Sequence, residues 1–138
     1  MASGTQLPQD GRTFTIAEVS EQTGLSPDTL RYYERAGLIE GVGRTTGNQR
    51  RYAAADLDWL AFLLRLRETG MPIAGMQRFA RLRGAGERTV ADRLAMLRKH
   101  RGSLEEHIRH LRRNARALDD KINHYERLLD GQQETEHP

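Results

Sequence analysis

The twelve residues Ser26–Gly37, with the sequence SPDTLRYYERAG, decide how the rest of the chain is interpreted. They predict a short helix whose two ends are defined by its own residues. Ser26 can cap the helix through its side-chain oxygen, and Pro27 suits the first helical position because its missing N–H would have no helical partner there. Gly37 suits the end of the helix, where a left-handed backbone conformation is common.

The polar face of this helix carries residue types that favour a nucleic-acid partner. Leu30 is expected to point into a core. The helical period then turns Arg31 and Arg35 outward, together with at least one of Tyr32 and Tyr33. Tyr33 is the better candidate of the two for the core. Arginine and tyrosine on the outside of a short helix are suited to phosphate and base edges.

The residues before Ser26 predict another helix, joined to the first by a tight turn. Thr13–Thr23 is expected to be helical, with Thr15 as its cap and Glu18 completing a capping box. Gly24 ends this helix and begins the turn. The two helices therefore form a helix-turn-helix in which Ser26–Gly37 is second, the place of the helix that reads DNA.

A basic β-hairpin is predicted after the helix-turn-helix. Gly47-Asn48 is a turn pair between two short extended segments. Arginines flank the turn and small polar side chains lie near its tip, and both kinds of side chain can reach phosphate oxygens. The hairpin therefore suits a wing that straddles the DNA backbone. The residues concerned are Arg44, Thr45, Thr46, Asn48, Arg50 and Arg51.

Two further helices are expected to complete the N-terminal core. Ala54–Thr69 has a broad apolar face, and a shorter amphipathic helix follows it. Trp59, Phe62 and Phe79 could line an effector pocket. Aromatic residues at helical spacing usually belong to a core, so we interpret these three as core residues.

From residue 87 to about 129, after a linker at 84–86, the sequence predicts one long helix. Apolar residues recur by heptads over about six repeats, which is typical of a coiled coil. A helix of about 65 Å, at ~1.5 Å per residue, cannot pack against a small domain of its own chain, so we infer a homodimer. Arg101 interrupts the apolar seam and is interpreted as a register or partner-contact feature. The seam positions are Val90, Leu94, Leu97, Arg101, Leu104, Ile108, Leu111, Ala115, Leu118, Ile122, Tyr125 and Leu129.

Length, composition and charge limit the possible classes of protein. The 138 residues allow one compact domain with an extension, and the net charge of +3 is by itself weak evidence for a polyanion partner. The chain has no cysteine, which excludes disulfides and thiolate metal sites. No secretory signal or apolar run of about 20 residues is present, so a cytoplasmic protein without membrane contact is expected.

The expected domain plan follows from these segments. It comprises a disordered arm at 1–12, a DNA-binding domain at 13–83, the linker at 84–86, a coiled-coil dimerisation helix at 87–130 and a disordered tail at 131–138. All five histidines lie in the C-terminal part of the chain. A metal site at His107 and His110 is conceivable, but their spacing also fits the solvated flank of a coiled coil, and neither a metal nor a cofactor is expected.

From about Phe14 to Leu129 the chain resembles the MerR family of bacterial transcription regulators. The resemblance rests on Thr15–Val19, on the block Thr29–Ile39 with its sequence TLRYYERAGLI, on the wing residues, and on Asp56-Leu57 with Leu60. The string L-R-Y-Y-E-x-x-G-L-I followed by R-x-x-x-x-x-R-x-Y is far more specific than a helix-turn-helix pattern alone.

The resemblance implies a mainly α-helical protein, with a winged helix-turn-helix followed by a long helix that dimerises as an antiparallel coiled coil. It implies that Arg31 and one of the tyrosines meet operator DNA, with Arg50 and Tyr52 near the flanking backbone. The expected DNA-contacting residues are Thr15, Ser26, Thr29, Arg31, Tyr32, Tyr33, Arg35, Arg44, Thr45, Asn48, Arg50, Arg51 and Tyr52. The expected dimer contacts are Leu94, Leu97, Arg101, Leu104, Ile108, Leu111, Leu118, Ile122 and Tyr125.

The resemblance also implies a mechanism for transcription control. The dimer would bind promoter DNA between the two promoter elements, and on activation it would bend and untwist an overlong spacer so that RNA polymerase can engage both. Such distortion costs several kcal/mol, which phosphate contacts must offset. The protein would be a regulator without catalytic activity.

The sequence departs from the family pattern at several points. Residues 40–43 replace the prolines that usually follow the Leu-Ile pair, and Gly47-Asn48-Gln49 replaces the usual wing-tip sequence, so phosphate contacts of the wing can differ. Ala53 stands where the third helix usually has a capping residue, and the missing cap is expected to lower the stability of the helix by ~1 kcal/mol. The cysteines through which metal, oxidant and aldehyde sensors act are missing, as is a large C-terminal drug-binding domain.

Two other functions fit the same motifs. An architectural or recombination-accessory protein would bend DNA without controlling transcription, and a coiled-coil adaptor would use its N-terminal domain to bind protein. The small-molecule effector, if one exists, is not identified by the sequence. A site around Phe79, Leu82 and Leu97 is the expected position for one.

Overall fold

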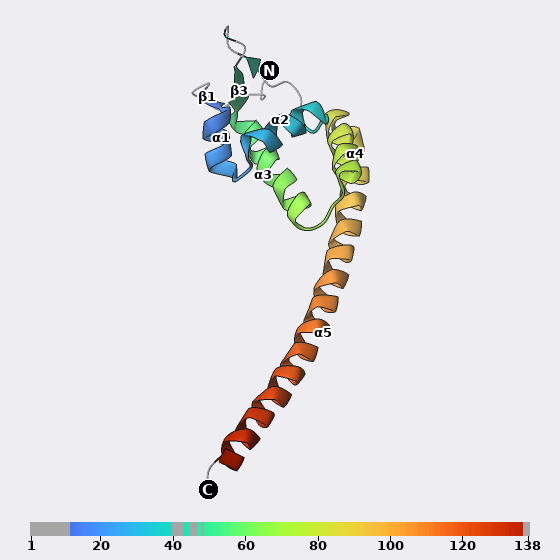
Figure 1. The fold of residues 1–138 in the computed structure, drawn as a ribbon. Helices are drawn as coiled ribbons and strands as arrows, with labels where there is room; N and C mark the ends of the chain where they lie inside the picture. The colour runs from blue at the N-terminus through green and yellow to red at the C-terminus, as the bar shows by residue number, and fades with distance from the viewer. Residues whose placement is uncertain (1–11, 40–42, 45–46, 48, 137–138) are drawn as a thin grey trace. The chain divides into compact units, whose positions relative to one another are not determined.

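The computed structural model describes residues 12–39, 43–44, 47 and 49–136 and divides the chain into two compact units, Met1–Met96 and Leu97–Pro138. Each unit is considered by itself. In chain order the elements are β1 (Thr13–Thr15), α1 (Ile16–Thr23), α2 (Pro27–Arg35), β2 (Gly43–Arg44), β3 (Arg50–Ala53), α3 (Ala54–Glu68), α4 (Ile73–Gly84), the short 3₁₀ turn η1 (Glu87–Thr89) and α5 (Val90–Glu136) (Figure 1).

A small antiparallel sheet with the strand order β1-β3-β2 lies beside the helix-turn-helix (Figure 1). The predicted hairpin is confirmed, because Gly43 pairs with Arg51 and Arg44 with Arg50. The sheet also contains β1, a strand that was not predicted. The expectation that the first helix begins at Thr13 is therefore wrong. Phe14 is buried and pairs with Tyr52. Pairing with β3 satisfies the backbone of these three residues, and the helix starts only after the Thr15 cap.

The helix-turn-helix forms as predicted, since each helix carries its own start signal. Thr15 caps α1, with both halves of the capping box present, and Gly24 ends the helix with a left-handed φ of 80°. Leu25 is buried in the turn, and Val19 and Leu30 are buried on the facing helices. The angle between α1 and α2 is therefore fixed by apolar contacts on both sides of the turn.

Helices α3 and α4 supply most of the remaining core of the N-terminal unit. Trp59 and Phe79 are buried with ring centroids 6.0 Å apart, and Phe62 is half-buried against both rings. The indole N–H of Trp59 donates to the Leu38 carbonyl oxygen at 2.7 Å. These contacts agree with the interpretation of the three aromatic residues as core.

The start of α3 compensates in part for the missing cap at Ala53. Its methyl side chain cannot accept a hydrogen bond, but the Ala53 N–H donates to Asp56 Oδ2 at 2.9 Å. Half of a capping box is therefore kept, and the acidic side chain lies in the first turn, where the helix dipole favours it.

Helix α5 differs from the predicted long helix at both ends. It begins at Val90 after η1, and it continues to Glu136 instead of ending near 130, so residues 131–136 are helical and the expected disordered tail is wrong for them. Gly131 costs only about 1 kcal/mol within a helix, and the Gln and Glu residues after it are good helix formers. The boundary between the two units lies within α5, after Met96, and not at the predicted linker 84–86.

The first turns of the long helix are anchored to the N-terminal unit by a buried threonine. The Thr89 hydroxyl donates to the Leu82 carbonyl oxygen at 2.5 Å, and Arg93 donates to Thr89 Oγ1 at 3.0 Å. These bonds explain why the residues before Leu97 cluster with the N-terminal unit. No helix among the described residues combines the length and the apolarity that a membrane span requires.

Candidate nucleic-acid interface

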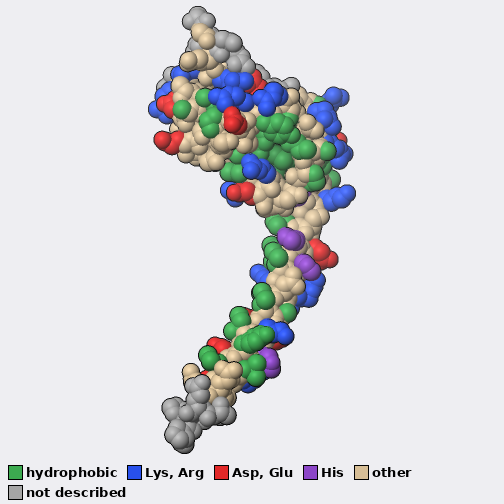
Figure 2. All heavy atoms as spheres, in the orientation of Figure 1, with side chains coloured by type: hydrophobic (Ala, Val, Ile, Leu, Met, Phe, Trp, Pro, Cys, Tyr) green, Lys and Arg blue, Asp and Glu red, His purple; other side chains and the backbone are tan. Residues whose placement is uncertain are grey.

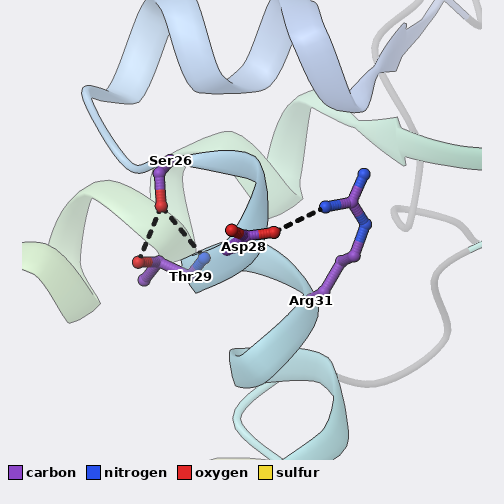
Figure 3. Close-up of polar contacts among 4 residues, drawn as sticks. All are labelled: Ser26, Asp28, Thr29 and Arg31. Carbon is purple, nitrogen blue, oxygen red and sulfur yellow. Dashed lines mark hydrogen bonds and ion pairs between the residues drawn. The ribbon is translucent and has the colours of Figure 1, made fainter.

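The N-terminus of α2 is held by a dense set of local hydrogen bonds (Figure 3). Ser26 Oγ accepts from the Thr29 backbone N–H at 3.1 Å and donates to Thr29 Oγ1 at 3.0 Å. Pro27 occupies the first turn, as predicted. Since both hydroxyl groups are used in the cap, Ser26 and Thr29 have a structural role at this position, whatever else they contact.

The exposed face of α2 carries the side chains suited to DNA. Tyr32 is 43% exposed and Arg35 is exposed at the last turn. The Arg31 guanidinium forms an ion pair with Asp28 at 2.9 Å and still leaves 41% of the side chain accessible (Figure 3). An exposed ion pair of this kind contributes little stability, so a phosphate group can replace the carboxylate at small cost.

Two tyrosines expected at the DNA are instead part of the core. Tyr33 is 2% exposed and Tyr52 is fully buried. Their hydroxyl oxygens are buried as well. The expectation that these side chains contact DNA is therefore wrong for this conformation, because the helical period turns Tyr33 toward Leu30 and the strand period turns Tyr52 inward beside Phe14.

The wing is joined to α2 and to β1 by its own arginines. Arg50 forms an ion pair with Glu34, and both side chains are less than one quarter exposed. Arg51 donates to Thr13 Oγ1 at 3.0 Å and to the Thr13 carbonyl oxygen at 3.4 Å. Both arginines, expected at phosphate groups, have protein partners in the free chain. They fix the position of the hairpin relative to the reading helix.

The C-terminus of α2 is also fixed from outside the helix. Gly37 has φ 81°, and the Leu38 N–H donates to the Tyr33 carbonyl oxygen at 2.9 Å. Gln77 of α4 donates through Nε2 to the Ala36 carbonyl oxygen at 2.9 Å. The reading helix is therefore held at both ends, which is the rigidity that recognition of base edges requires.

The tip of the wing lies mostly outside the described residues. Thr45 and Asn48 belong to this undescribed part, and Arg44 is described only as a backbone member of β2. The predicted DNA contacts of these three residues therefore stay predictions.

At the cap of α1, Thr15 and Glu18 exchange hydrogen bonds. Glu18 N–H donates to Thr15 Oγ1 at 3.1 Å, and the Thr15 N–H donates to Glu18 Oε1 at 2.8 Å. The Thr15 backbone bond is the main reason that the pKa of Glu18 lies below its ordinary value of 4.5, with Arg51 and Arg12 adding smaller electrostatic effects. The Thr15 hydroxyl is thus a helix cap in the free protein.

The predicted dimer seam lies along α5 as a stripe of exposed apolar side chains (Figure 2). Leu97 and Leu104 are half-buried, and Arg101 is exposed. The other predicted dimer contacts are exposed to at least 36%: Leu94, Ile108, Leu111, Leu118, Ile122 and Tyr125. Pairing with another chain is not itself part of the structure, and these contacts stay predictions.

Sequence reasoning missed three residues that position the interface. Glu34 fixes the wing, Gln77 fixes the end of α2, and Thr13 holds Arg51. All three act through contacts between elements far apart in the sequence. No local pattern in the sequence identifies such contacts, and Glu34 is one of two acidic residues in α2, beside Asp28.

No group of three or more metal-ligating side chains occurs among the described residues. The neighbouring His107 and His110 lie on the exposed part of α5. For the suggested effector position, Phe79 is buried and Leu82 half-buried, while Leu97 belongs to the other unit.

A helix-turn-helix with a rigid second helix, outward arginine and tyrosine, and a basic antiparallel hairpin defines a DNA-binding protein of the winged helix-turn-helix class. The chain belongs to the MerR family. Residues 14–82 match the family described as "MerR HTH family regulatory protein", and residues 57–121 match "MerR, DNA binding".

Similar proteins and structures agree with this assignment. An uncharacterised HTH-type transcriptional regulator of Haemophilus influenzae is 34% identical over 115 residues, which is 83% of this chain and 85% of the relative. The regulator AdhR of Bacillus subtilis is 40% identical over 91 residues, 66% of this chain and 65% of AdhR.

Two solved structures match over most of both chains. HiNmlR, a MerR family regulator lacking the sensor domain and bound to promoter DNA, has a TM-score of 0.77 at 34% identity, over 84% of this chain and 92% of HiNmlR. A MerR family protein of Listeria monocytogenes has a TM-score of 0.83 at 35% identity, over 89% of this chain and 94% of that one. The chain is therefore a MerR-family DNA-binding transcriptional regulator, a class of protein that is not enzymatic.

Proposed function

We propose that the chain binds promoter DNA as a homodimer and controls transcription by distorting the DNA between the two promoter elements, so that RNA polymerase can engage both. The exposed face of α2, with Arg31, Tyr32 and Arg35, carries this proposal. Each protomer would place α2 in a major groove and the basic hairpin over the adjacent backbone, which gives two half-sites related by two-fold symmetry.

The apolar stripe of α5 supports the dimer. Large apolar side chains on one side of a helix are stable in water only when another surface covers them. Pairing of α5 with the same helix of a second chain buries the stripe and also duplicates the DNA-binding unit. HiNmlR, which lacks a sensor domain and is bound to promoter DNA in its crystal structure, is a precedent for promoter binding by a chain of similar length.

In-vitro transcription with purified polymerase tests the distortion. Promoters whose spacers differ by one or two base pairs should respond differently, with activation at an overlong spacer and none, or repression, at the standard length. An architectural protein would give the same footprint on every spacer with unchanged transcription. A protein-binding adaptor would show no salt-dependent binding to duplex DNA, which would refute the proposal at its first step.

A further inference from the structure

The second unit of the chain consists of one helix whose apolar side chains follow a single side (Figure 2). Beyond Met96, Leu97 and Leu104 are half-buried, and the other large apolar side chains of the stripe range from 36% exposed at Ile108 to 64% at Leu118. Charged and histidine side chains occupy the remaining surface. Such a stripe requires a partner with a matching apolar stripe and complementary charges.

We propose that the partner is a second copy of the chain in one particular antiparallel register, in which Ile108 lies against the partner's Leu111. The two-fold axis then passes between residues 109 and 110. This inference rests on the homodimer proposed above and adds the residues that determine how the two helices align.

Arg101 decides the relative direction of the two helices. In a parallel pair each seam residue faces its own copy, so Arg101 would face the partner's Arg101 within an apolar seam. In the antiparallel register it faces the partner's Leu118. Its aliphatic stem can pack there while the guanidinium reaches solvent beside the partner's Asp119. The like-charge contact is thereby avoided.

Completeness of the seam favours this register over its neighbours. Pairing Ile108 with the partner's Leu111 also pairs all other seam positions, from Val90 with the partner's Leu129 to Leu104 with the partner's Ala115. A shift by one heptad in one direction leaves Tyr125 and Leu129 without seam partners. The opposite shift leaves Val90 and Leu94 without them, although each is about half exposed.

The charges beside the seam select the same register. In an antiparallel coiled coil the residues that directly follow one row of seam residues face their equivalents across the interface. These positions include Arg98, Glu105, Arg112 and Asp119, all exposed in the single chain. The proposed register places Arg98 against the partner's Asp119 and Glu105 against the partner's Arg112, each twice by symmetry.

Neither neighbouring register is complementary in this way. One places Glu105 against the partner's Glu105 and Arg98 against the partner's Arg112. The other places Arg112 against the partner's Arg112 and Glu105 against the partner's Asp119. Like charges at these flanking positions disfavour both, so the chain's own charges exclude slippage by a heptad.

A charge-reversal cycle on the full chain tests the register by sedimentation equilibrium. Glu105→Arg and Arg112→Glu should each weaken the dimer about tenfold, because two ion pairs per dimer become two like-charge contacts. The double variant should return to within about threefold of the original dimer. An equimolar mixture of the two single variants should form heterodimers preferentially, since each foreign pair is complementary.

The matched control lies on the outer face of the same helix. Glu106→Arg and Arg113→Glu make the same charge changes at the same spacing, so they carry the same effects within one helix. They should change dimerisation by less than about threefold and show no coupling and no preference in mixtures.

Each contrary result identifies a different error. A tighter dimer from Arg112→Glu would indicate the register in which residue 112 lies against the partner's Arg98. A tighter dimer from Glu105→Arg would indicate the register in which residue 105 lies against the partner's Asp119. Zero coupling with an intact original dimer would overturn the register and leave the homodimer standing. A monomeric original chain would overturn the homodimer itself.

Discussion

At the scale of single residues, Arg31 is paired with the acidic Asp28 in the free protein, and in the proposed complex a DNA phosphate would take the place of that carboxylate. The Asp28 carboxylate is 97% exposed, so water screens its attraction for the guanidinium. Arg50 is different, because its pair with Glu34 is mostly shielded from solvent. Of the two arginines, Arg31 is therefore the one free to change partners on binding.

Replacement of Arg31 by alanine should weaken operator binding by about 1–3 kcal/mol at fixed salt, since a charge-assisted contact to DNA is lost. The salt dependence of binding should fall by about one ion if the contact is to phosphate. Arg113→Ala, which removes the same charge from the outer face of α5, is the control. Unchanged affinity in a folded Arg31→Ala dimer, measured by fluorescence anisotropy, would refute the assigned role of α2.

Replacement of Asp28 by asparagine should have the opposite effect. It releases Arg31 and removes a negative charge near the DNA, and we expect affinity to rise by about 0.5–1 kcal/mol. The gain should shrink in an Arg31→Ala background, as a double-mutant cycle would measure. An equal gain in both backgrounds would show that Asp28 repels DNA without restraining Arg31.

At the scale of elements, the sequence predicted those features that have local causes. Ser26, Gly24 and Gly37 defined the ends of the helices, and heptads defined α5. Strand β1 was missed because three residues show no period, and they are extended only through pairing with β3. Arg50 was assigned to DNA because its partner Glu34 lies in another element, α2, and no local pattern shows that contact.

The cap of α1 should give the fold a measurable dependence on acid. The pKa of Glu18 is lowered in the folded protein, chiefly by the Thr15 backbone N–H, so the ionised form stabilises the fold. This contribution is fully present above the ordinary value of 4.5 and is lost as the pH falls through the lowered folded-state value.

Urea unfolding at a series of pH values from 7 to 3 measures this contribution. The free energy of unfolding should fall less over this range in Glu18→Gln than in the original chain. Glu21→Gln, at another exposed position of the same helix and outside the capping box, is the charge-matched control and should keep the original profile. Identical profiles for Glu18→Gln and the original chain would show that the capping box is already broken in solution.

At the scale of the whole molecule, DNA recognition depends on a helix that contacts no DNA in the proposed arrangement. The N-terminal unit has one α2, and two half-sites can be read together only if α5 joins two such units. One half-site contributes roughly half of the contacts, so loss of the dimer should cost most of the affinity at fixed protein concentration.

Leu104→Lys combined with Leu111→Lys should convert the protein to a monomer, because two charged side chains per chain would replace apolar contacts in the middle of the seam. The control is His110→Lys combined with Ala117→Lys, which adds lysines at the same spacing on the outer face. Sedimentation should show monomers for the first pair and dimers for the second, with the fluorescence of Trp59, which is buried in the N-terminal unit, showing that this unit stays folded in both. An intact dimer of the Leu104→Lys, Leu111→Lys variant would place the interface elsewhere, and then the two-fold arrangement of the reading helices would have to be derived from another surface.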